Sequence, residues 1–196
     1  MNNKQLICEN IVKNCLITPK QLMFGKLPGT RYASQFYLSN CLYDSKFLNL
    51  VVHEFHDLVK KEIGNFDFQL TGREWSSIPL LVGLPLLLKQ HYNIEINSFM
   101  IKRERKKYGL HNYIEGKPND LPILIIDDVC NSTNSFKFCY DVLLAEEKYK
   151  ILPYIFAVLN KYGKNSAENA LTEDRYLKAK FKPLFIVSGD DINAIR

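Results

Sequence analysis

The sequence predicts a single α/β domain in which helices flank a mostly parallel central sheet on both faces. Strand-like and helix-like apolar patterns alternate along most of the chain, which is typical of parallel sheets. Residues 121–126 form a continuous apolar run rich in β-branched residues, as expected of a central strand buried on both faces. The 196 residues, 46% of them hydrophobic, suffice for one sizeable core. Since no Gly/Pro-rich linker divides them, we expect one domain over residues 1–196.

The first half of the predicted fold contains two helices and two strands. Apolar residues recur at helical spacing over residues 48–61, and this helix ends at Gly64. An alternating strand follows at residues 66–70. Residues 78–91 then predict a second, more apolar helix, and residues 94–101 contain a second strand. The order of strand and helix therefore repeats.

The second half continues this alternation. The strong strand at residues 121–126 precedes a helix at residues 136–148 and a strand at residues 151–159. Residues 168–180 predict an exposed helix of mixed charge, to which we assign no function.

Charge and composition narrow the class of protein. A net charge of +5 suits a protein whose ligand is a polyanion. The cations are densest at residues 102–107, a short cluster and not a long basic tail, so we expect no nucleic-acid partner. The longest apolar run, residues 80–88, is far shorter than the roughly 20 residues of a membrane helix and predicts a buried helix instead. Residues 1–5 lack the features of a secretory signal, which predicts a cytoplasmic protein.

The cysteines and histidines indicate no metal or redox centre. Reduced and mostly buried thiols are expected at Cys8, Cys15, Cys41, Cys130 and Cys139, which show no close pairing in the sequence. His53 and His56 lie three residues apart, but no second pair of ligands accompanies them. Cys130 is expected to be a packed thiol.

Two carboxylates follow the strongest strand. Asp127 and Asp128 lie at its carboxyl end, where ligands bind in open α/β sheets. The next residues are small and polar and lead into a helix: Asn131, Ser132, Thr133, Asn134 and Ser135. Backbone N–H groups and the helix dipole favour a phosphate at such a loop, while carboxylates accept hydrogen bonds from ribose hydroxyls or hold hydrated Mg²⁺. These groups together predict a ribose 5-phosphate site; the alternative is an ordinary helix N-cap at Ser132 or Asn134.

A basic segment precedes this site in the chain. Five cations lie within six residues, namely Lys102, Arg103, Arg105, Lys106 and Lys107. Holding them together is costly unless an anion neutralises them, so the cluster predicts binding of a diphosphate-sized group. The alternative is a solvated surface segment.

Residues 123–130 resemble the motif of the type I phosphoribosyltransferases, in which a hydrophobic strand precedes two acidic residues, a hydrophobic pair and a Thr/Gly-rich phosphate loop. In this chain Asn131 and Ser132 replace two small hydroxyl residues, and Thr133 replaces a Gly. The resemblance implies the fold of that family.

Residues 99–116 resemble the catalytic loop of the orotate phosphoribosyltransferases. Lys106 falls on the family's catalytic lysine, and Lys102 and Arg103 fall on residues that hold the diphosphate, with Lys107 beside them. Tyr108 replaces the usual histidine. In the family this loop reaches into the neighbouring subunit's site, so the resemblance implies a homodimer.

Residues 71–79 resemble the family's diphosphate-binding turn. Gly72, Glu74, Ile78 and Pro79 fit the pattern Gly-x-Glu-x-x-Gly-Ile-Pro, with Arg73 inside it. Ser76 and Ser77 occupy positions that the family often fills with Lys or Ala and with Gly.

Residues 31–38 loosely resemble the family's base-binding hood. Candidate base contacts are Lys26, Arg31, Phe36 and Tyr37, although Phe36 and Tyr37 are equally compatible with core positions of a strand. We expect about residues 1–45 to form a small hood and N-terminal segment and about 46–165 to form the core. The C-terminal remainder is expected to pack on either part.

By resemblance, the chain transfers the 5-phosphoribosyl group from 5-phosphoribosyl 1-diphosphate to a nucleobase, with orotate as the expected acceptor. Asp127, Asp128 and Lys106 would be the catalytic residues. Mg²⁺ would be held mainly by the diphosphate, with water-mediated contacts to the two aspartates. The departures at Thr133, Tyr108, Ser76 and Ser77 leave two alternatives: a non-catalytic protein that senses phosphoribosyl diphosphate or binds RNA, and a transferase for another base.

Overall fold

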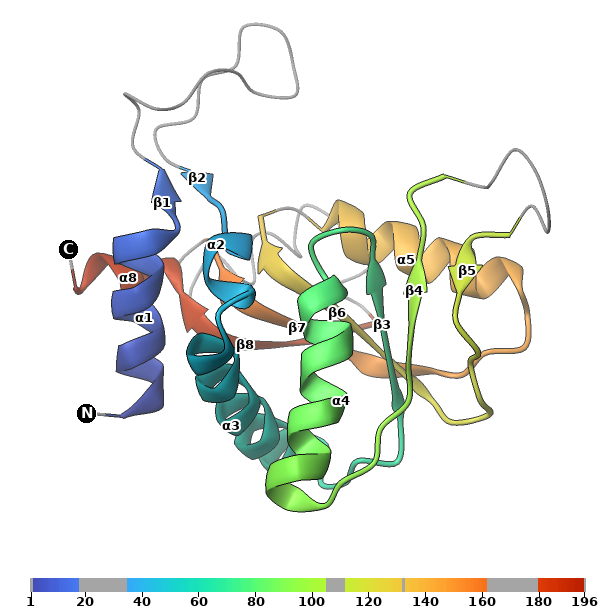
Figure 1. Ribbon diagram of the computed structural model, residues 1–196. Helices are drawn as coiled ribbons and strands as arrows, with labels where there is room; N and C mark the ends of the chain where they lie inside the picture. Colours follow the sequence, from blue (N-terminus) through green and yellow to red (C-terminus); the bar gives the residue numbers. More distant parts are fainter. Residues whose placement is uncertain (1, 18–34, 105–111, 132, 162–179, 196) are drawn as a thin grey trace, which may run out of the picture.

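A computed structural model describes residues 2–17, 35–104, 112–131, 133–161 and 180–195 (Figure 1). Within these residues, a six-stranded sheet has the order β5-β4-β3-β6-β7-β8. The strands are β3 (Gln69–Arg73), β4 (Ser98–Ile101), β5 (Ile114–Glu115), β6 (Ile123–Cys130), β7 (Ile151–Asn160) and β8 (Lys182–Ser188). Neighbouring strands are parallel except at the β4–β5 edge. The prediction of an α/β fold with a mostly parallel central sheet is confirmed.

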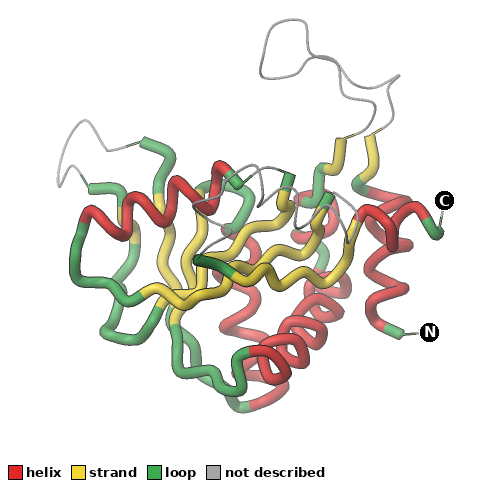
Figure 2. The backbone as a smooth tube through the Cα atoms, turned by 180° about the vertical axis from the view of Figure 1, so that it is seen from behind, coloured by secondary structure: helices red, strands yellow, loops and turns green. Residues whose placement is uncertain are grey.

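Helices cover both faces of this sheet. One face carries α1 (Asn3–Asn14), α2 (Ser39–Leu42), α3 (Ser45–Glu62) and α4 (Ile78–Tyr92). The opposite face carries α5 (Asn134–Ala145), as the view from behind shows (Figure 2). A short helix, α8 (Gly189–Asn193), follows β8, and a separate two-stranded antiparallel sheet joins β1 (Leu16–Ile17) to β2 (Gln35–Phe36).

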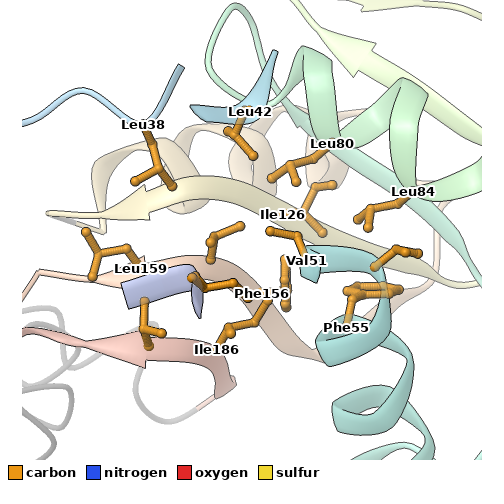
Figure 3. Packing of buried hydrophobic residues seen from close by; sticks show 14 of the residues in the cluster. Leu38, Leu42, Val51, Phe55, Leu80, Leu84, Ile126, Phe156, Leu159 and Ile186 are labelled. Carbon is orange, nitrogen blue, oxygen red and sulfur yellow. The ribbon is translucent and has the colours of Figure 1, made fainter. Parts of the chain in front are cut away.

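The large core lies between the sheet and the helices of the first face (Figure 3). Its buried side chains include Val51, Phe55, Leu80, Leu84, Ile126 and Phe156. The rings of Phe55 and Phe156 meet edge to face at 4.8 Å. Successive residues of β6 alternate between this core and the smaller core under α5, so the central strand is buried on both sides as expected.

Two strands differ from their predicted ranges. The strand expected at residues 66–70 is β3, which begins at Gln69. Phe66 instead lies in the preceding loop, where its ring stacks on His56, so its apolar character reflects loop packing. Strand β6 continues past Ile126 to Cys130, because β7 remains paired with it there while the β3 ladder ends at the Gly72–Ile126 pair.

Helix α4 is less buried than its sequence predicts. Val82 and Leu86, four residues apart, are 57% and 66% exposed on its outer side. Gly83 faces the other way, where an added Cβ would meet the Leu48 side chain of α3. Among the described residues, no helix has the length and apolar content required to cross a lipid bilayer.

Helix α1 and strand β8 were not predicted. Only Ile7, Cys8 and Ile11 of α1 are buried, which leaves a weak apolar pattern in the sequence. These residues pack against α3, β8 and α8, which are remote in the chain. The helix expected at residues 168–180 lies outside the described residues apart from Lys180.

Candidate functional site

Strands β3 and β6 are neighbours in the sheet, and the strands that follow them in the chain are added on opposite sides of this pair. From β3 the chain continues through α4 on one face to β4, and from β6 through α5 on the other face to β7. A crevice forms at the carboxyl ends of strands at such a point. The described residues leave a cavity of about 590 Å³ there. It is lined by residues from three segments, 35–43, 73–79 and 127–131, and by Arg103 after β4 and Ser135 in α5.

The predicted acidic pair lies in this cavity. Asp127 is buried, and its Oδ1 accepts hydrogen bonds from the Ser76 hydroxyl at 2.8 Å and the Asp128 amide at 2.9 Å. Asp128 is half-buried and accepts a hydrogen bond from the Val129 amide at 2.7 Å. Since β3 does not pair with β6 beyond Ile126, this end of β6 borders the cavity.

Burial controls the ionisation of the pair. It raises the pKa of Asp127, an effect that the hydrogen bond from Ser76 opposes. The pKa of Asp128 rises to about 7, first because of burial and second because of the negative charge of Asp127. The pair therefore holds a proton more readily than exposed carboxyls do, and a nearby cation would favour its charged form.

The turn after β3 depends on the absence of a side chain at Gly72. An added Cβ would lie 2.5 Å from both the Ile126 carbonyl oxygen and the Ser77 Cβ. Ser77 begins α4 as its N-cap residue, and its hydroxyl donates to the Arg73 carbonyl at 2.6 Å. Gly72 thus allows α4 to begin directly against the central strands.

Glu74 ties this turn to β4. Its amide donates to the Ile101 carbonyl at 2.9 Å, and its carboxylate accepts from the Arg103 amide at 3.0 Å. The Arg73 guanidinium lies 4.8 Å from the ring centre of Phe138 in α5, and its buried Nε has no hydrogen-bond partner among the described residues. Arg73, Glu74 and Arg103 all line the cavity.

The side chain of Lys102 points away from the cavity. Its ammonium group is buried and donates to Asn112 at 3.0 Å and to the Glu115 carboxylate at 3.1 Å. It does not line the cavity, whereas the adjacent Arg103 does. Its predicted diphosphate contact stays a prediction. The candidates Lys106, Lys107 and Tyr108 lie outside the described residues.

The expected phosphate loop borders the same cavity through Asn131 and Ser135. Thr133 is the N-cap of α5, has an ordinary φ of −75°, and makes no side-chain capping hydrogen bond. The β-branched side chain therefore needs no unusual backbone conformation. Thr133 and Asn134 do not line the cavity, and Ser132 lies outside the described residues.

The N-terminal segment supplies one wall. Phe36 and Tyr37 line the cavity as predicted candidates, and Phe36 also packs against the large core. Lys26 and Arg31 lie outside the described residues. The sequence did not identify the further lining residues Gln35, Leu38, Ser39, Tyr43, Trp75, Ser76, Pro79 and Val129 as site residues. Trp75, Ser76, Pro79 and Val129 lie within recognised motifs, but no sequence pattern places residues 39–43 beside the sheet.

The described residues contain no group of three His, Cys, Asp or Glu side chains suited to a metal ion. The His53 Nδ1 lies 2.6 Å from the Tyr92 hydroxyl, and His56 stacks on the Tyr92 ring. All five cysteines are buried, as predicted, and the Cys15 and Cys41 sulfurs lie 2.6 Å apart. Burial raises the pKa of the Cys130 thiol to about 12, which agrees with a packing role.

No family model matches the chain. A curated relative, the orotate phosphoribosyltransferase of Buchnera aphidicola subsp. Acyrthosiphon pisum (strain Tuc7), is 23% identical over 124 residues. This match covers 63% of the chain and 57% of the relative's length.

Solved structures match nearly the whole chain. The Mycobacterium tuberculosis H37Rv orotate phosphoribosyltransferase in complex with Fe(III) dicitrate has a TM-score of 0.72 at 12% identity, covering 97% of this chain and 98% of that one. The Aeropyrum pernix orotate phosphoribosyltransferase has a TM-score of 0.71 at 14% identity, covering 96% and 97%. The Mycobacterium enzyme in complex with 5-phospho-alpha-D-ribosyl 1-diphosphate has a TM-score of 0.67 at 12% identity, covering 97% and 99%. The resemblance found in the sequence is confirmed, and the chain has the type I phosphoribosyltransferase fold.

Proposed function

We propose that this protein is a phosphoribosyltransferase that transfers the 5-phosphoribosyl group from 5-phosphoribosyl 1-diphosphate to a nucleobase. Orotate is the proposed acceptor, giving orotidine 5′-phosphate and diphosphate. The observation that carries the proposal is the cavity at the β3–β6 crevice, where Asp127 and Asp128 lie with Arg73, Arg103 and the start of α5. The names of the similar proteins support the same activity.

Each part of the substrate has a suitable chemical partner in this cavity. Asp127 and Asp128 would accept hydrogen bonds from the ribose hydroxyls. The α5 N-terminus, with Asn131 and Ser135, would hold the 5-phosphate. Arg73 would contact the leaving diphosphate, as would Arg103.

Catalysis at such a site is mainly positioning and electrostatic stabilisation. As the bond from the anomeric carbon to the diphosphate breaks, positive charge develops on the ribose and negative charge on the leaving group. Asp127 and Asp128 would contact the ribose, and Arg73 and Arg103 would stabilise the departing anion. Lys106 would add a further cation at the diphosphate by its match to the family's catalytic lysine.

The donor set fits Mg²⁺ only in part. Asp127 and Asp128 supply the hard oxygen ligands that this ion prefers. Glu74 also lines the cavity, but the described residues contain no group of three such side chains arranged to hold a metal ion. The ion would therefore be held mainly by the diphosphate, with the aspartates contacting it through water. When bound, it would neutralise charge on the leaving group.

Pyrophosphate release tests the proposal. Wild-type protein is supplied with 5-phosphoribosyl 1-diphosphate, Mg²⁺ and either orotate or a panel of other bases, beside Lys106→Ala. We expect orotate-dependent release that falls about 100-fold or more in the variant, the loss typical of a missing transition-state contact, with ribose 5-phosphate affinity retained. Release with another base alone would reassign the acceptor. Tight substrate binding without release for any base would contradict the enzyme proposal and favour a sensor.

The proposed homodimer makes a further distinction possible. If Lys106 of one subunit serves the site of its partner, Lys106→Ala and Asp128→Asn subunits complement each other. Mixing the two inactive variants should then restore about a quarter of wild-type activity, because half of the randomly paired dimers are mixed and each contains one intact site. No recovery after verified subunit exchange would place Lys106 in the site of its own chain.

A further inference from the structure

Three large aromatic side chains are exposed among the residues that the structure describes. Tyr37 is 54% exposed, Tyr43 is 74% exposed and Trp75 is 67% exposed. All three line the same cavity as Asp127 and Asp128. Exposed apolar surface that gathers at one cavity indicates a binding function.

The aromatic residues come from two separate segments. Tyr37 and Tyr43 flank α2, whereas Trp75 lies in the turn between β3 and α4. The residue after Trp75 is Ser76, whose hydroxyl contacts Asp127 at 2.8 Å. Trp75 is therefore one residue away from the group that touches the proposed ribose site.

The kind of side chain identifies the ligand chemistry. An indole presents a broad π-face and has one N–H donor, so it recognises the face of a flat ring much more than its edge groups. Base–aromatic stacking is tolerant of base identity because every nucleobase has a π-face. A saturated, puckered ring would lose most of this interaction.

We propose that Trp75, with Tyr37 and Tyr43, forms a stacking surface for the planar heterocycle, and that Trp75 discriminates flat aromatic rings from puckered ones. This proposal rests on the proposed function, because it assigns the ring-binding part of the same site. It adds Trp75 and Tyr43 to the candidate base contacts.

Two nucleotides that differ in ring planarity test it. Uridine 5′-monophosphate and 5,6-dihydrouridine 5′-monophosphate carry the same edge carbonyl and N–H groups, but only the first has a flat aromatic ring. Ribose 5-phosphate serves as the ligand without a base. Calorimetry would give all three affinities, and the emission of Trp75, the chain's single tryptophan, would report ring contact directly.

We expect wild-type protein to bind uridine 5′-monophosphate about tenfold more tightly than 5,6-dihydrouridine 5′-monophosphate. This is the effect of one base–aromatic stack. Trp75→Ala should remove this preference, and Trp75→Phe should retain most of it. Val82→Ala, which truncates an exposed side chain outside the cavity, is the matched control and should leave it unchanged.

The outcomes separate this proposal from the proposed function. Equal wild-type affinity for the two nucleotides, or a preference that survives Trp75→Ala, would overturn the stacking role even with normal ribose 5-phosphate binding. Failure of wild-type protein to bind ribose 5-phosphate or either nucleotide would overturn the phosphoribosyl site itself, and the stacking role with it.

Discussion

Replacing Gly72 with alanine should destabilise the protein through a clash that no side-chain rotation can relieve. The new Cβ would lie 2.5 Å from the Ile126 carbonyl oxygen and from the Ser77 Cβ. Ordinary contacts between carbon atoms begin near 3.5 Å, so each neighbour is about 1 Å too close. One neighbour is backbone of the central strand β6, and the other is fixed to the backbone at the start of α4.

Relief therefore requires β3 to separate from β6 or α4 to move. Overpacking in a core costs typically 1–3 kcal/mol, and two rigid obstacles place Gly72→Ala at the upper end, about 3 kcal/mol. This is a large share of a total stability of roughly 5–15 kcal/mol. With a urea slope of about 2 kcal/mol per M, the unfolding midpoint should fall by about 1.5 M.

Urea unfolding followed by circular dichroism measures this loss. Gly83→Ala is the matched control, because its added Cβ meets only the flexible end of Leu48 and alanine gains about 1 kcal/mol over glycine in a helix. We expect a midpoint change below about 0.5 M for the control. A Gly72→Ala midpoint within that same margin of wild type would refute the packing argument.

Two further predictions concern charge. Because burial raises the pKa of Asp128 to about 7, the folded protein retains this proton more strongly than the unfolded chain, and the free energy of unfolding should fall as pH rises from about 4 to about 7. Asp128→Asn should weaken that fall in urea titrations at successive pH values, and an undiminished fall would contradict the assignment. Glu115→Gln should lower the melting temperature more than Lys102→Met, because the first change leaves a buried ammonium without its carboxylate and the second leaves a half-exposed carboxylate that water solvates. Equal or reversed losses in thermal melts would show that Lys102 is solvated in solution.

The sequence predicts the central elements well because their burial is regular. The apolar positions of α3 repeat at helical spacing, and the continuous run in β6 reflects cores on both faces. The acidic pair was found because a polar interruption at the end of such a strand is itself a signal. Its position within β6, and not after it, depends on pairing with β7, which periodicity does not report.

Other features depend on contacts that are distant in the chain. The side chains of Lys102 and Arg103 are adjacent in sequence yet differ in direction, so a count of cations could not separate the buried ion pair from the cavity-lining arginine. Tyr43 joins the cavity wall only because the N-terminal segment folds beside the carboxyl end of the sheet. The apolar surface of α1 is small, and its partners include β8 near the other end of the described chain.

The contact between α1 and β8 determines when this part of the core can form during translation. Ile7 and Ile11 share a core with Leu184 and Ile186, and Lys4 forms an ion pair with Asp191 at 3.0 Å. Ribosomes add roughly 5–20 residues per second, so the first helix emerges roughly ten seconds or more before its last partner strand. During that interval the part of its apolar side that packs on β8 has no partner. The final closure of this core must therefore follow translation of β8.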